Sequence, residues 1–197
     1  MPKTRDKNEN IKDKLIETTC EMIAENNGAS NINMRAVARR AGCAHTNVYS
    51  YFTSFNDLLY AAMLRTLEKL VIFTQANVGA RASTKEHFPK FIYAQIDFAI
   101  QYPGLFRFIW LEALTEPVPD IIKAFGCELK NRFAELVYNC SDGKLTRKQA
   151  LEYSVIVHSY MHGEICKMIS GRDNVNFCES RENIKANIEQ LMLLFIN

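Results

Sequence analysis

The stretch from Asn31 to Leu59 places the strongest constraint on the fold of this 197-residue chain. Asn33 can cap a helix, because its side-chain oxygen can accept hydrogen bonds from the free amides of the first turn. Gly42 can adopt the left-handed conformation in which helices often end. Between these two residues, apolar side chains recur at the spacing of one helical face, at Met34, Val37, Ala38 and Ala41. The stretch therefore predicts a short helix that is followed by a tight turn.

A second, shorter helix is predicted directly after this turn. Val48 and Phe52 are its apolar positions and would face the protein, whereas its other side chains would point mostly outward. Two helices joined across a glycine-containing turn form a helix-turn-helix, whose second helix is presented to the major groove of DNA. A small helical pair that only packs against the rest of the protein is the alternative interpretation.

The outward side of this helix pair has the chemistry of a DNA-binding surface. Its polar side chains can exchange hydrogen bonds with base edges, and its tyrosines can reach phosphate or sugar oxygens. Arg35, Arg39 and Arg40 lie in the interval 26–56, which contains no acidic residue, and such a charge excess suits a polyanion. The residues predicted to contact DNA are Arg35, Ala44, His45, Thr46, Asn47, Tyr49, Tyr51 and Ser54.

The same residues resemble the DNA-binding module of the TetR family of bacterial transcriptional regulators. The run from Met34 to Cys43 is similar to that family's Arg-x-Ile-Ala helix and Ala-Gly-Val turn, and the run from Val48 to Ser54 is similar to its recognition helix. The resemblance implies an all-α fold of about nine helices. It also implies a homodimeric repressor that binds a palindromic double-stranded DNA operator and is released by a small-molecule effector.

The expected organisation has two parts. Residues 1–54 would form the helix-turn-helix domain, and residues 55–197 would form the effector-binding and dimerisation domain. Ala44 stands where the family usually has a serine, and a missing side-chain cap costs about 1 kcal/mol. His45 and Thr46 also depart from the family pattern, so they are expected to set the base preference. Phe55 stands where a lysine is common, which puts one phosphate contact in question.

Apolar periodicity predicts helices along most of the chain. Residues 1–8 are expected to be a flexible basic arm. Ser54 with Asp57, and Ser83 with Glu86, resemble capping boxes at helix starts. Helices are predicted at about 9–27, 55–78, from Ser83, on both sides of Pro103, from Pro119 to Cys140, after Thr146, and at about 180–196.

Two further surfaces are predicted in the C-terminal part. The resemblance places an effector site among the middle helices, and the predicted ligand-binding residues are Gln95, Phe98, Trp110, His158 and His162. Apolar stripes on the last two helices predict dimerisation through a four-helix bundle, with burial inside the monomer as the alternative. The predicted interface residues are Ile184, Ile188, Leu191, Met192 and Phe195.

Several other classes of protein are disfavoured. The six cysteines form no C-x-x-C pair, the N-terminal segment has no signal-peptide pattern, and charged residues interrupt the apolar region 91–114. A cytoplasmic protein without a membrane span is therefore expected. No nucleophile–base pair or nucleotide-binding loop is found, so neither an enzyme nor a cofactor is predicted.

Two alternative functions stay open. His158, His162 and Cys166 share one helix face and could serve a metal- or redox-responsive sensor, although no fourth ligand is evident and no metal site is predicted. An adaptor that binds only proteins is the second alternative. Salt-sensitive DNA binding would separate it from a regulator.

Overall fold

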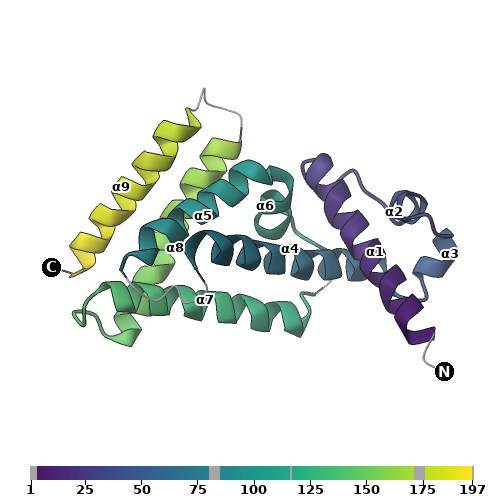
Figure 1. The fold of residues 1–197 in the computed structure, drawn as a ribbon, viewed down its shortest axis with the longest axis horizontal. Coiled ribbons are helices and arrows are strands. Elements are labelled where there is room, and N and C mark those ends of the chain that lie inside the picture. Colours follow the sequence, from purple (N-terminus) through teal and green to yellow (C-terminus); the bar gives the residue numbers. More distant parts are fainter. Residues whose placement is uncertain (1–3, 80–84, 116, 171–175, 197) are drawn as a thin grey trace. The chain divides into compact units, whose positions relative to one another are not determined.

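The computed structural model describes residues 4–79, 85–115, 117–170 and 176–196, with side chains placed for all of these except 4–9, 177 and 196. Within these residues it contains nine α-helices and no strand (Figure 1), which confirms the predicted all-α fold. The helices are α1 (Thr4–Glu25), α2 (Met34–Ala41), α3 (His45–Val48), α4 (Phe55–Val78), α5 (His87–Gln101), α6 (Pro103–Trp110), α7 (Asp120–Cys140), α8 (Arg147–Ile169) and α9 (Phe177–Ile196). None of these helices is long and apolar enough to cross a membrane.

The chain divides into two compact units. The first runs to Lys69 and includes Tyr102–Ile122, and the second combines Leu70–Gln101 with the chain from Lys123 onward. Helix α4 therefore begins in the first unit and ends in the second. The proposed functional boundary between residues 54 and 55 stays a prediction, and the compact units have different bounds because α6 packs on α1.

In the first unit, α1 packs against α2, α6 and the first half of α4 (Figure 1). The Cys20 thiol of α1 donates to the Ala62 carbonyl of α4 at 3.5 Å, and burial raises the pKa of this thiol to about 11. Arg65 of α4 pairs with Glu17 and, at 3.1 Å, with Asp13 of α1. Apolar contacts inside and ion pairs outside thus hold these two helices together.

Local signals define the ends of the helices around the turn. Asn33 Oδ1 accepts from the Ala36 amide at 3.0 Å, and Gly42 has the left-handed φ of 72°. Ser54 Oγ accepts from the Asp57 amide at 3.0 Å, while Asp57 accepts in return from the Thr53 amide and not from Ser54. The predicted bounds of α2 and α4 are confirmed, and the predicted box at α4 is displaced by one residue.

In the second unit, α5, α8 and α9 pack pairwise around a core in which Ile92, Phe98, Val157 and Ile188 are no more than 1% exposed (Figure 1). Thr146 and Gln149 form a capping box at the start of α8, as the sequence predicts for Thr146.

A cluster of polar contacts ties α9 to α5. The Arg181 guanidinium donates to both carboxylate oxygens of Asp97 at 2.7 and 2.6 Å, and it lies over the ring of Tyr93.

Three predicted helix bounds need correction or lie outside the structure. Helix α1 begins at Thr4, so residues 4–8 belong to this helix and are not a flexible arm. Helix α9 begins at Phe177, because Asn176 Oδ1 accepts from the amides of Cys178 and Glu179. Ser83 lies outside the described residues.

Candidate functional site

Two buried apolar side chains pack the short helix α3 against the protein. Val48 is fully buried and Phe52 is 2% exposed. Ala44 gives α3 no side-chain cap, so its start depends on the backbone bond from the Asn47 amide to the Ala44 carbonyl at 2.9 Å. The helix is only four residues long. Its position is therefore fixed by packing and not by helical hydrogen bonds.

The other side of α3 faces solvent within the first unit. Thr46 and Asn47 are exposed, and Tyr49 is 54% exposed although it is a large aromatic residue. The His45 and Tyr49 rings meet edge to face, with centroids 5.2 Å apart. Tyr51 is only half-exposed. These side chains form one polar and aromatic surface, which is here called the α3 surface; its contact with DNA stays a prediction.

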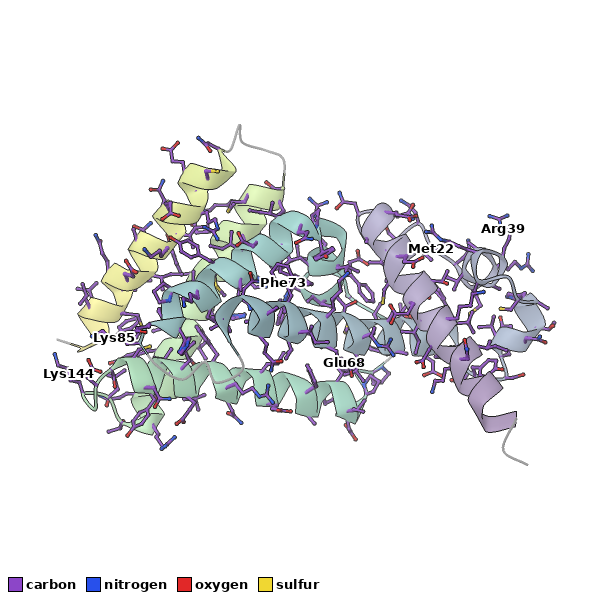
Figure 2. All side chains as sticks on the ribbon, viewed as in Figure 1. Met22, Arg39, Glu68, Phe73, Lys85 and Lys144 are labelled. Atoms are coloured by element: carbon purple, nitrogen blue, oxygen red, sulfur yellow. The ribbon has the colours of Figure 1, made fainter. Side chains whose placement is uncertain are left out.

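Of the three arginines in the predicted cluster, Arg40 is already engaged in ion pairs within the protein. Arg40 is bound by Glu25 and Glu21 of α1, and the hydrogen bond from Arg40 holds the pKa of Glu25 below its usual value. Arg35 and Arg39 are exposed and make no ion pair within the described part of the chain, and Figure 2 shows Arg39 on the outer side of α2. The interval 26–56 contains no acidic residue, but the fold brings Glu21 and Glu25 of α1 next to Arg40.

Two lysines of α1 bring positive charge to the same region. The Nζ atom of Lys12 lies 5.7 Å from the centre of the Phe52 ring, and Lys14 Nζ lies 3.9 Å from the position of a Cβ built on Gly42. Sequence reasoning missed both residues. In the sequence, Lys12 and Lys14 lie next to the apolar residues of α1, which was the only hint of their role. Their position near the turn becomes visible only from the packing of α1 on α2.

The predicted ligand-binding residues are divided between the two units. Trp110 belongs to the first unit, whereas Gln95, Phe98, His158 and His162 belong to the second. Gln95 donates to Thr74 Oγ1 at 2.9 Å, and Phe98 is fully buried against Phe73. Their contact with an effector stays a prediction.

The two histidines lie in an aromatic environment. The His158 and His162 rings stack with centroids 5.3 Å apart, and His158 meets the edge of Phe133 at 6.2 Å. Burial lowers the pKa of His158, and it lowers the pKa of His162 to about 4. Both imidazoles are therefore neutral at pH 7.

The metal-sensor alternative gains no support from this face of α8. Cys166 Sγ lies 3.8 Å from His162 Nδ1. However, no three His, Cys, Asp or Glu side chains converge as a metal site among the described residues.

The predicted dimer residues are mostly core residues. Ile184, Ile188 and Met192 are 3%, 0% and 6% exposed within the single chain, because their stripe packs against the neighbouring helices. Their assignment to a subunit interface stays a prediction, and their burial within the single chain favours the alternative left open by the sequence. Leu191 is half-buried, and Phe195 stacks on Tyr153 with ring centroids 4.2 Å apart. The exposed apolar residues of α8 and α9 are Leu151, Val155, Ile156, Leu193 and Leu194.

The arrangement of helices matches solved structures of transcriptional regulators. A TetR-family regulator from Streptomyces coelicolor matches over 95% of this chain and 82% of that chain, with a TM-score of 0.74 and 14% identity. The chain has the TetR fold. A TetR-fold regulator from Shewanella sp. PV-4 matches over 90% of this chain and 95% of that one, with a TM-score of 0.68 and 18% identity.

A third TetR-fold structure contains a bound small molecule. It is a TetR variant from Acinetobacter baumannii in complex with minocycline, which matches over 92% of this chain and 93% of that one, with a TM-score of 0.61 and 16% identity. No family model matches the sequence, and no curated protein is significantly similar to it. The similarity therefore establishes the TetR fold of this chain.

Proposed function

We propose that this protein is a TetR-family transcriptional regulator that represses by binding a palindromic operator as a homodimer, and that a small-molecule effector releases it. The observation that carries this proposal is the α3 surface, which is held outward on Val48 and Phe52 within a TetR fold. Exposed Thr46, Asn47 and Tyr49 supply donors, acceptors and an aromatic ring of the kind that read DNA.

Phosphate contacts in this proposal come from more than one helix. Arg35 and Arg39 of α2 are available, whereas Arg40 is already neutralised by α1. Lys12 and Lys14 add charge from the side of α1. Two copies of this surface would bind half-sites whose centres are about 34 Å apart, or a multiple of that distance.

Dimerisation is proposed through the outer sides of α8 and α9. Ile184, Ile188 and Met192 of α9 are buried within the single chain. On the outer sides of the two helices, Val155, Ile156 and Leu194 are 45%, 47% and 75% exposed. Large apolar side chains exposed on two adjacent helices favour association. Two such helix pairs can pack as a four-helix bundle.

Effector binding is proposed near the neutral histidines of the second unit. Aromatic surface with a few uncharged hydrogen-bonding groups is the usual lining of a small-molecule site. The minocycline complex of a structural neighbour supports a small-molecule effector in this fold. To release DNA, the effector must bind the released state more tightly than the DNA-bound state, and the ratio of the two affinities sets the response.

The test is DNA binding at several salt concentrations, with the upstream intergenic DNA as the probe. Arg35→Ala and Arg39→Ala should each weaken binding and reduce the slope of log affinity against log salt by about one. Arg40→Ala is the matched control, because its charge is compensated by Glu25 and Glu21. It should leave the slope nearly unchanged.

Two further variants test the α3 surface. His45→Ala should reduce the preference for operator over unrelated DNA by about tenfold for a lost base contact. Tyr49→Phe should weaken binding to both DNAs, because its hydroxyl is assigned to phosphate or sugar oxygens. The proposed function is wrong if the wild-type protein binds no DNA in a salt-dependent way. The assigned surface is wrong if both variants bind the operator as tightly as the wild type.

A further inference from the structure

The segment that follows α6 contacts the chain once before and once after the helix-turn-helix. It comprises residues 111–115 and is here called the strap; like α1, α2 and α3, it belongs to the first compact unit. One anchor is the carboxylate of Glu112, and the other is the hydroxyl of Thr115. Neither residue belongs to the region that the sequence pattern assigned to DNA binding.

The Glu112 anchor holds the chain just before α2. Both of its carboxylate oxygens accept from the Ala29 amide, each at 3.0 Å, and Ala29 is only 6% exposed. Gly28 makes this approach possible, because it has a φ of +145° and a Cβ built on it would lie 2.1 Å from Glu112 Oε1. A buried amide that loses its acceptor is destabilised, so the carboxylate has a defined task at this position.

The strap is joined to the end of α6 by backbone hydrogen bonds. The amides of Leu111 and Glu112 both donate to the Arg107 carbonyl, at 2.8 and 3.2 Å, at the end of that helix. The start of α6 lies against α1, where a Cβ built on Gly104 would be 2.6 Å from the Ile23 carbonyl oxygen. A shift of α6 would therefore displace Glu112 together with it.

The Thr115 anchor holds the chain just after α3. The Asn56 side-chain amide, in the first turn of α4, donates to Thr115 Oγ1. The whole helix-turn-helix, with α2, the turn and α3, lies between the chain positions that the two anchors hold. Its two ends are thus fixed to one short segment.

We propose that the strap positions the α3 surface for DNA, with Glu112 and Thr115 as positioning residues. This inference rests on the proposed function, because positioning is defined with respect to the operator. A movement of α6 changes the path of the chain at both ends of the helix-turn-helix.

The test combines amide exchange with operator binding in the full-length protein. Glu112→Ala should speed hydrogen exchange at the Ala29 amide by roughly tenfold and weaken operator binding by about fivefold or more. Glu112→Gln should restore most of both properties, because an amide oxygen can still accept from the Ala29 amide. Glu86→Ala removes an exposed carboxylate of the second unit and is the matched control. It should change neither property.

Thr115→Val tests the second anchor and keeps the inference testable if Glu112→Ala does not fold. It removes the acceptor of Asn56 with little change of volume, and it should weaken operator binding without loss of helix content. Faster exchange at Ala29 with unchanged operator affinity would overturn the positioning role. Unchanged exchange would show that the Glu112 anchor is absent. Wild-type protein that binds no DNA would overturn both proposals, and the exchange data would still show whether the anchor exists.

Discussion

His158 and His162 are stacked on α8, and burial keeps both imidazoles neutral near neutral pH. The pKa of His162 is about 4 in the folded chain, against 6.5 for an ordinary histidine. Below pH 6.5 the unfolded chain therefore takes up a proton that the folded chain resists. The contribution of His162 to stability is complete above pH 6.5 and is lost as the pH falls towards 4.

This linkage predicts a measurable acid sensitivity. Between pH 7 and pH 5 His162 should contribute a stability loss of about 1 kcal/mol after allowance for partial solvent screening, or about 2–4 °C in Tm. His162→Gln should reduce this loss, because glutamine does not titrate. Thermal unfolding at pH 7 and pH 5 measures the fall in Tm for each protein. An equal fall in Tm for wild type and His162→Gln would contradict the prediction.

At the scale of elements, two helical glycines have opposite surroundings. A Cβ built on Gly104 would meet backbone atoms at the end of α1 and just after it, 2.6 Å from the Ile23 carbonyl oxygen and 2.9 Å from the Asn27 Cα. A Cβ built on Gly126 of α7 would have no atom within 4 Å. The first glycine permits close packing of α6 on α1, whereas the second only weakens its helix.

Substitution by alanine should therefore change stability in opposite directions. Gly104→Ala should destabilise the protein by about 1–3 kcal/mol, because backbone atoms cannot move aside easily. Gly126→Ala should stabilise it by about 0.5–1 kcal/mol, through helix propensity alone. Denaturant unfolding of the two variants measures both effects. A neutral Gly104→Ala would show that α6 can separate from α1 at little cost.

Elements with local signals were predictable from sequence. The ends of α2 follow from Asn33 and Gly42, and the start of α8 follows from the cap at Thr146. Pro103 separates α5 from α6 as expected. In each case the decisive contact joins residues only a few positions apart, so the pattern alone contains the information.

Contacts between distant residues were not predictable in the same way. Arg40 belongs to an acid-free stretch of sequence, yet it pairs with Glu25, 15 positions away. Ile188 has the same helical periodicity whether it faces its own core or another subunit, so its burial could not be assigned from spacing. The outward direction of His45 and Tyr49 followed from the buried positions on the opposite side of α3, whereas the strap anchors needed three-dimensional coordinates.

At the scale of the whole molecule, the exposed apolar residues of α8 and α9 predict self-association. The double variant Val155→Glu with Leu194→Glu should convert a dimer into a monomer, since charges placed in an apolar interface lack partners. Its helix content should be unchanged, because both positions are exposed in the single chain. Ile72→Glu, at an equally exposed apolar position of α4, is the matched control and should leave the dimer intact.

Analytical ultracentrifugation distinguishes these outcomes. The double variant should also bind the operator at least about 100-fold more weakly, because one half-site no longer raises the effective concentration of the other. A wild-type protein that sediments as a monomer at micromolar concentration would contradict the dimer. Equal masses for wild type and double variant would place the interface elsewhere.

Because α3 is so short, operator binding should depend on temperature. A helix of four residues without a side-chain cap has little cooperative order of its own, so we expect its exposed side to lose order before the longer helices unfold, while Val48 and Phe52 keep it packed. Contact with the duplex must then restore that order, at an entropic cost that grows on warming. If the proposed function holds, operator affinity should therefore fall on warming well before the protein itself denatures.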